Sequence, residues 1–279
     1  MRVGVREICD VVLKAKANQK LGNLCFKPGM PVMYFETAKT SSLEGAATTV
    51  YATGGKGNSR LIAWEGEKTL TFTLEDALIS PLGFAILSGA GLAEASAEKP
   101  IKVHQTSDII VDGEGFVTLT GVKVDATADV YVMKLDGNGE MVGLPIKATA
   151  EVTGNDTTIE ADGLVVDELV KVDYYVEKTA KASEITITPD KFAGFYYLEA
   201  STLFRKEETG EDLPAEFVIP KVKVQSNWTF SMAATGDPST FTFTMDAFPD
   251  YTKFDKTKKV LACLQIIDEG ASSEECAGE

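Results

Sequence analysis

The residue types that most often carry catalysis or bind metals are few and scattered in this chain. Its 279 residues include a single histidine, His104, so a Ser-His-Asp triad or a histidine-rich metal site would have to use that side chain. No other candidate catalytic or metal-binding residue lies near His104 at the spacing of a known motif. No CxxC spacing typical of a zinc site connects the four cysteines, which are Cys9, Cys25, Cys263 and Cys276. We interpret them as reduced thiols.

Two glycine-containing segments are similar to ligand loops only in part. Residues 54–58 (GGKGN) lack the GxxxxGK[ST] spacing of a phosphate loop and predict a surface loop. Residues 136–140 (DGNGE) alternate oxygen ligands as calcium loops do, but lack a fourth acidic ligand and flanking helices, and predict a tight hairpin. Acid pairs such as Glu65 and Glu67 are typical of a solvated surface. The sequence therefore predicts no catalytic residue, no cofactor, no metal site and no enzyme.

The chain is strongly acidic. It has 42 acidic and 27 basic residues, a formal net charge of −15, which argues against electrostatic capture of DNA or anionic lipid. No run of about eighteen apolar residues predicts a membrane span. The start of the sequence has no apolar segment of a signal peptide, and we expect no membrane anchor.

The charge is unevenly distributed and suggests three parts. Residues 1–104 carry a net charge of +2, residues 105–200 carry −11 and residues 201–279 carry −6. We interpret 1–104 and 201–279 as two parts of one β-domain, and 105–200 as an acidic, β-rich block that is compatible with an inserted subdomain.

The first part mixes predicted strands with a helix. Residues 5–14 have apolar residues at helical spacing, which favours a short helix over a strand. A loop-like segment follows around Pro28, and residues 60–67 and 68–74 alternate as two strands. The best helical pattern covers about 76–88, although Pro81 favours a start with Ser80 as N-cap. This helix is apolar almost all round and predicts a buried position.

The middle part predicts many short strands. Turn signals lie at 112–113, 136–139, 153–156 and 162–163, and the intervening segments are rich in valine, isoleucine, threonine and tyrosine. This pattern predicts a sandwich or barrel, compatible with an immunoglobulin-like module.

The last part predicts a hairpin over 222–248, with a turn at 234–238, and a further strand at 259–267 before a polar tail. Six large apolar residues fall on one face of the hairpin and predict a buried sheet face. They are our candidate core or assembly residues: Trp228, Phe230, Met232, Phe241, Phe243 and Met245.

Residues 225–241 and 259–267, with residues 60–92, resemble the tail tube (major tail) proteins of tailed bacteriophages. The resemblance implies a mainly β fold, a sandwich or barrel with one helix, that forms hexameric rings stacked into a hollow tube. It also implies a virion tail protein made in the host bacterial cytoplasm, with sheath, baseplate and tail terminator proteins as partners. DNA would pass down an acidic bore without specific binding, and open sheet edges would be completed by neighbouring subunits.

Other classes stay open from the residues alone. A capsid decoration or connector subunit would have a similar composition. An adhesin-like, carbohydrate-binding β-sandwich would use exposed aromatic residues of the middle part.

Overall fold

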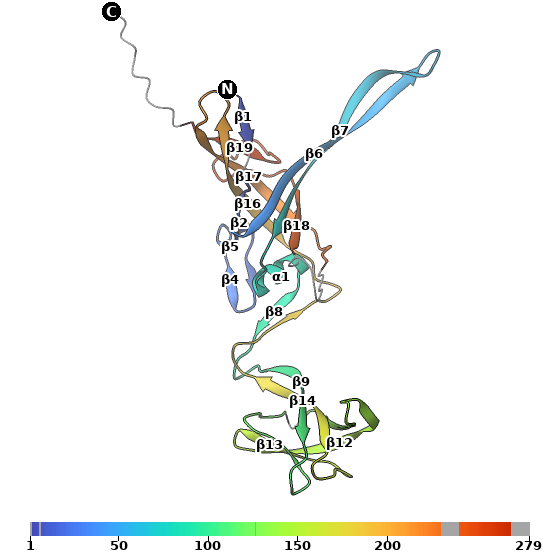
Figure 1. The fold of residues 1–279 in the computed structure, drawn as a ribbon. Helices are drawn as coiled ribbons and strands as arrows, with labels where there is room; N and C mark the ends of the chain where they lie inside the picture. Colours follow the sequence, from blue (N-terminus) through green and yellow to red (C-terminus); the bar gives the residue numbers. More distant parts are fainter. Residues whose placement is uncertain (1, 6, 126, 230–239, 269–279) are drawn as a thin grey trace, which may run out of the picture. The chain divides into compact units, whose positions relative to one another are not determined.

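Strands dominate the computed structural model, which describes residues 2–5, 7–125, 127–229 and 240–268 (Figure 1). The described chain forms two units. Unit 1 comprises Met1–Leu92 and Ile185–Glu279, and unit 2 comprises Ala93–Glu184. Unit 2 overlaps the acidic block predicted at 105–200 but has other bounds, because it begins at Ala93 and residues 185–200 belong to unit 1. A mainly β fold, as predicted, is confirmed.

Unit 1 is built on a nine-stranded antiparallel sheet. Its central order is β5-β2-β16-β17-β18-β7-β6, with β1 added to β16 and β19 added to β17. Its strands are β1 (Val3–Val5), β2 (Asp10–Ala15), β5 (Pro31–Phe35), β6 (Ala38–Gly54), β7 (Ser59–Asp76), β16 (Phe195–Lys206), β17 (Asp212–Val224), β18 (Phe241–Ala247) and β19 (Cys263–Ile266).

Two small ribbons complete the strand inventory outside the two main sheets. One pairs β3 (Gln19–Leu21) with β4 (Leu24–Phe26), and the other pairs β8 (Gly91–Glu94) with β15 (Ser183–Thr186).

The prediction of a helix for residues 5–14 is wrong. Its described residues form the end of β1, a short connection and most of β2. Val11, Leu13 and Ala15 are buried in alternation, which is the period of a strand. Strand β2 pairs with β16 on one side and β5 on the other. These two sets of backbone hydrogen bonds outweigh a weak helical pattern.

Strands β6 and β7 form one long hairpin. The two strands predicted at 60–67 and 68–74 are a single strand, β7, and its partner β6 was not predicted. The glycine-rich loop at 54–58 forms the turn of this hairpin, as expected for a surface loop.

The described residues contain one helix, α1 (Pro81–Ser88), which is shorter than the predicted 76–88. Asp76 still belongs to β7, and the alternative start at Ser80 is confirmed. The Ser80 hydroxyl accepts a hydrogen bond from the Gly83 backbone N–H at 3.0 Å, and Pro81 occupies the first helical position. Gly89 ends the helix at φ 68°, a left-handed conformation that favours glycine.

The core of unit 1 lies between α1 and one face of the large sheet. Ile86 and Leu87 of the helix join fully buried residues of the sheet, including Phe35, Phe72 and Phe243. The rings of Phe35 and Phe243 meet edge to face with centroids 4.8 Å apart.

The hairpin predicted over 222–248 is different in the structure. Strand β17 ends at Val224, and β17 and β18 pair only over residues 222–224 and 245–247. Trp228 follows the end of β17, so the strand predicted to continue to Met232 is wrong over its described part. The predicted turn at 234–238 lies outside the described residues. The strand predicted at 259–267 is confirmed as the shorter β19.

Unit 2 is built on a six-stranded antiparallel sheet in which one strand has a different partner on each of its halves. Strand β12 pairs with β11 over its first half and with β13 over its second. The valine-rich interior includes Val132, Ile159 and Val172, all fully buried. The predicted turns at 136–139 and 153–156 are confirmed as the β11–β12 and β12–β13 turns. Its main strands, in sheet order, are β10 (Val117–Leu119), β13 (Asp156–Glu160), β12 (Met141–Thr153), β11 (Val130–Leu135), β14 (Leu169–Lys178) and β9 (Ile101–Ile110).

Candidate assembly surfaces and a lysine pocket

The outer part of the β6–β7 hairpin, residues 45–68, is called the arm here. All of its residues except the half-buried Ala52 and Gly54 are exposed, whereas the base of the same hairpin contributes Phe72 and Leu74 to the core. Figure 1 shows the hairpin extending beyond the other strands of its sheet. A two-stranded ribbon in water is only marginally stable, because each strand has a single neighbour and no core to cover it.

The two faces of the arm differ in chemistry. Val50 pairs with Trp64, and Ala52 pairs with Ile62, so these four side chains share one face. Val50, Ile62 and Trp64 are each more than half exposed. A contiguous apolar face of this kind is typical of a surface that another molecule covers.

The opposite face of the arm is more polar. Tyr51 pairs with Ala63, and the Arg60 guanidinium lies 4.0 Å from the centre of the Tyr51 ring. Thr49 pairs with Glu65 on the same face. The arm is therefore amphipathic, although its sequence alone did not predict that β6 exists.

The face of the large sheet opposite the core is polar. Thr73 of β7 and Thr244 of β18 pair across this face, next to Asp246, which accepts hydrogen bonds from Thr71 and Gln225. Further along the sheet, the Lys14 ammonium forms an ion pair with Glu199. The neighbouring Glu216 has a raised pKa, because burial and the charge of Glu199 disfavour its ionised form.

The candidate core or assembly residues fall into two groups. Phe241, Phe243 and Met245 of β18 are buried in the core of unit 1. Trp228 is half-buried and packs edge to face on Phe84, with ring centroids 4.9 Å apart. Phe230 and Met232 lie outside the described residues.

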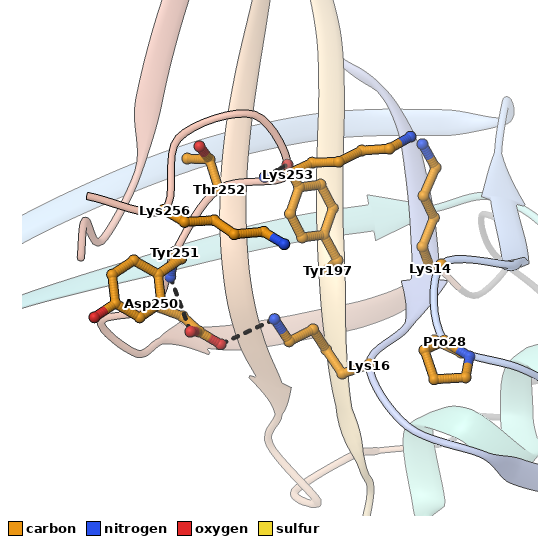
Figure 2. Close-up of a pocket in the computed structure, with 11 residues that line it drawn as sticks. Lys14, Lys16, Pro28, Tyr197, Asp250, Tyr251, Thr252, Lys253 and Lys256 are labelled. Carbon is orange, nitrogen blue, oxygen red and sulfur yellow. Dashed lines mark hydrogen bonds and ion pairs between the residues drawn. The ribbon is translucent and has the colours of Figure 1, made fainter. Parts of the chain in front are cut away.

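A pocket of about 530 Å³ opens beside the start of β16 (Figure 2). The ring of Tyr197 lies at its centre, and lysines from two separate segments surround it. Its principal lining residues are Lys14, Lys16, Pro28, Tyr197, Asp250, Tyr251, Lys253 and Lys256. We call this site the lysine pocket. The lysine-rich run at 253–259 is the sequence signal that could have indicated part of it, and no site was predicted there.

The four lysines of the pocket are not equally neutralised. Lys14 pairs with Glu199, and Lys16 pairs with Asp250 at 2.9 Å. The Lys16 ammonium holds the pKa of Asp250 below its usual value. Lys253 and Lys256 are exposed, and neither has an ion-pair partner in the described part of the chain. The pocket therefore offers two free ammonium groups near a phenol ring.

His104 lies on an exposed strand of unit 2. Its Nε2 is 2.8 Å from a carboxylate oxygen of Asp173, and its ring packs on Tyr175. The pair was not visible in the sequence, because Asp173 is 69 residues away and is brought next to His104 by the pairing of β9 with β14.

The DGNGE segment is closed by its own backbone. The carboxylate of Asp136 accepts hydrogen bonds from the backbone N–H groups of Asn138 and Glu140, which lowers its pKa. This is a hairpin turn, as predicted.

Among the described residues no three His, Cys, Asp or Glu side chains cluster as metal ligands. No helix of the described chain is long and apolar enough to cross a membrane.

A mainly β subunit with an uncovered apolar arm and an extended polar sheet face has the features of an assembling structural protein. Comparison with known families identifies which one: residues 4–261 match the YomU/Tube protein family, and the chain belongs to it. The predicted resemblance to phage tail tube proteins is thereby supported over nearly the whole chain. No curated protein matches the chain.

Proposed function

We propose that this chain assembles into rings that stack into the tail tube of a phage virion, with the arm of each subunit covered by a neighbouring subunit. The observation that carries this proposal is the apolar face of the arm, formed by Val50, Ile62 and Trp64, in a member of a tube family. These side chains are 54–64% exposed, so covering the exposed part contributes about 1–2 kcal/mol each. Hexameric rings and contacts with sheath, baseplate and terminator proteins are what the tail tube resemblance implies.

The polar face of the large sheet is the bore wall in this proposal. Its threonine hydroxyls and internally paired charges leave few free ammonium groups to hold a phosphate backbone. The net negative charge of the subunit adds a general repulsion of DNA phosphates. DNA held by many cationic side chains would be slow to leave, so a wall with few free cations favours passage. Genome DNA would then slide through the tube without specific binding.

Electron microscopy of negatively stained, concentrated protein tests the assembly. We expect hollow tubes of uniform diameter with a regular axial repeat. A field of particles that stay monomeric at every concentration, and in the presence of tail-initiating proteins, would contradict the proposal.

Two substitutions at adjacent arm residues test the interface. Ile62→Asp places a charge on the apolar face, and we expect a folded subunit that forms no tubes. Ala63→Asp places the same charge on the opposite face, near Arg60, and we expect normal tubes. If Ile62→Asp assembles as well as the unchanged protein, the arm is not the interface.

A further inference from the structure

The lysine pocket has an unusual charge for this molecule. The chain carries a net charge of −15, yet this pocket is lined by four lysines and one aspartate. Lys253 and Lys256 face it with no carboxylate of the described chain in ion-pair distance. A ligand that fits the site must therefore carry negative charge.

Aromatic rings surround the same lysines. Lys16 lies 5.9 Å from the centre of the Tyr197 ring, and Lys253 lies 5.6 Å from that of Phe254, which is 88% exposed. Exposed ammonium groups beside open aromatic rings match both a carboxylate-bearing peptide and a nucleic acid. The sequence of the chain itself favours the peptide.

The chain itself contains a segment with this chemistry. Residues 269–279 (EGASSEECAGE) have four glutamates and no basic residue, and they lie outside the described residues. They follow Asp268, whose carboxylate pairs with Lys206 at 2.8 Å near the end of β16. Strand β19 pairs with β17 from Val218 to Ala215 and so runs toward Asp268. This direction leads away from Tyr197, and therefore away from the lysine pocket of the same subunit.

We propose that the lysine pocket binds the acidic segment 269–279 of a second copy of this chain. The inference rests on the proposed function, because it requires a neighbouring subunit whose β19 ends close to this pocket. Carboxylates of Glu274 and Glu275 would accept hydrogen bonds from the Lys253 and Lys256 ammonium groups. Such an occupant also neutralises the lysines of this pocket, so that passing DNA phosphates are not held there.

A zero-length carbodiimide crosslink between lysine and glutamate tests the contact directly. Tubes are assembled from equal amounts of ¹⁵N-labelled and unlabelled full-length protein, and the crosslinked peptides are identified by mass spectrometry. We expect Lys253 or Lys256 joined to Glu274 or Glu275 in peptides of mixed isotope composition. The Lys206–Asp268 pair provides the positive control within one chain.

Two results would overturn the inference. One is formation of the Lys206–Asp268 crosslink without any crosslink to Lys253 or Lys256. The other is a crosslink found only within single copies. If the protein forms no tubes, only the proposed function is contradicted. The crosslinks are then measured in concentrated protein, and absence of the inter-copy peptides there would still refute the docking.

Charge reversal gives an independent readout. The double variant Lys253→Glu, Lys256→Glu should weaken association about fivefold per contact at low salt, with little effect at high salt. Adding Glu274→Lys and Glu275→Lys to the same chain should restore it. Lys123→Glu with Lys178→Glu in unit 2 is the matched control. An equal loss in this control, or no rescue, would contradict the pairing.

A DNA-binding assay distinguishes a site for an acidic peptide from a site for nucleic acid. Full-length protein should not bind a short fluorescent duplex, whereas removal of residues 269–279 should expose the lysines and give weak binding that salt abolishes. Binding by the full-length protein that is lost in the Lys253→Glu, Lys256→Glu variant would show a nucleic-acid site instead.

Discussion

Replacing Phe243 by alanine is the sharpest test of the core of unit 1. The side chain is fully buried, and its ring contacts Phe35 edge to face at 4.8 Å. Truncation of a buried phenylalanine costs about 3–5 kcal/mol, in which the aromatic pair contributes about 0.5–1.5 kcal/mol. We expect a loss near the middle of that range, about 4 kcal/mol.

Urea unfolding followed by tryptophan fluorescence measures this loss. Both tryptophans, Trp64 and Trp228, belong to unit 1, so their signal reports this unit. With a slope of about 3 kcal/mol/M for a unit of this size, the midpoint should fall by about 1.3 M. Thr242→Ala is the matched control, because the adjacent side chain is exposed on the other sheet face, and it should change stability by less than about 0.5 kcal/mol.

A loss below about 1 kcal/mol for Phe243→Ala, or an equal loss for Thr242→Ala, would refute the assignment of the two sheet faces. Hydrogen exchange of the buried strand β14 provides a second check. Its core is separate from that of unit 1, so its protection should be unchanged.

Three further predictions follow from local geometry. Ser80→Ala removes the N-cap acceptor of α1 and should destabilise unit 1 by about 1 kcal/mol in the same urea assay, whereas Ser80→Asp should not. Gly89→Ala should cost more and lower the yield of folded protein, since a Cβ at φ 68° would lie 2.4 Å from the Phe192 carbonyl carbon; unchanged stability would contradict this helix end. The pKa of Asp125 is lowered by its ion pair with Lys102, so its stabilising effect is present above the unfolded pKa of 3.8 and is lost as pH falls through the lower folded value. Acid titration of unit 2, followed by hydrogen exchange, should therefore show a decline below about pH 4 that Asp125→Asn flattens, and an identical titration of both proteins would refute the assignment.

Residues whose local pattern and tertiary surroundings agree were predictable. The turns of unit 2 carry Asp-Gly and Asn-containing signals, and the structure places hairpin turns there. Ser80 and Pro81 fix the start of α1 by capping and by the restricted φ of proline. The alternation of Phe241, Phe243 and Met245 predicts a buried strand face, and these residues are buried.

Residues whose structure depends on distant strands were not predictable. Ile8, Val11 and Val12 have a weak helical spacing, and pairing with β16 and β5 makes residues 10–15 a strand instead. Strand β6 was missed because most of its side chains are exposed and its alanine- and threonine-rich sequence shows no apolar alternation. The lysine pocket combines β2 with residues 250–256, which are more than two hundred residues apart, so no spacing in the sequence indicates it.

The pairing of β9 with β14 has a consequence for how this chain tolerates change. Ile101 at the start of β9 lies opposite Lys178 at the end of β14, and the Ala95 N–H donates to the Ala182 carbonyl at 2.9 Å. The chain therefore enters and leaves unit 2 through adjacent backbone positions, as a domain inserted into a loop would. A two-residue turn joining these positions would satisfy the same backbone geometry. We therefore expect that a chain in which such a turn replaces unit 2 still folds the sheet of unit 1.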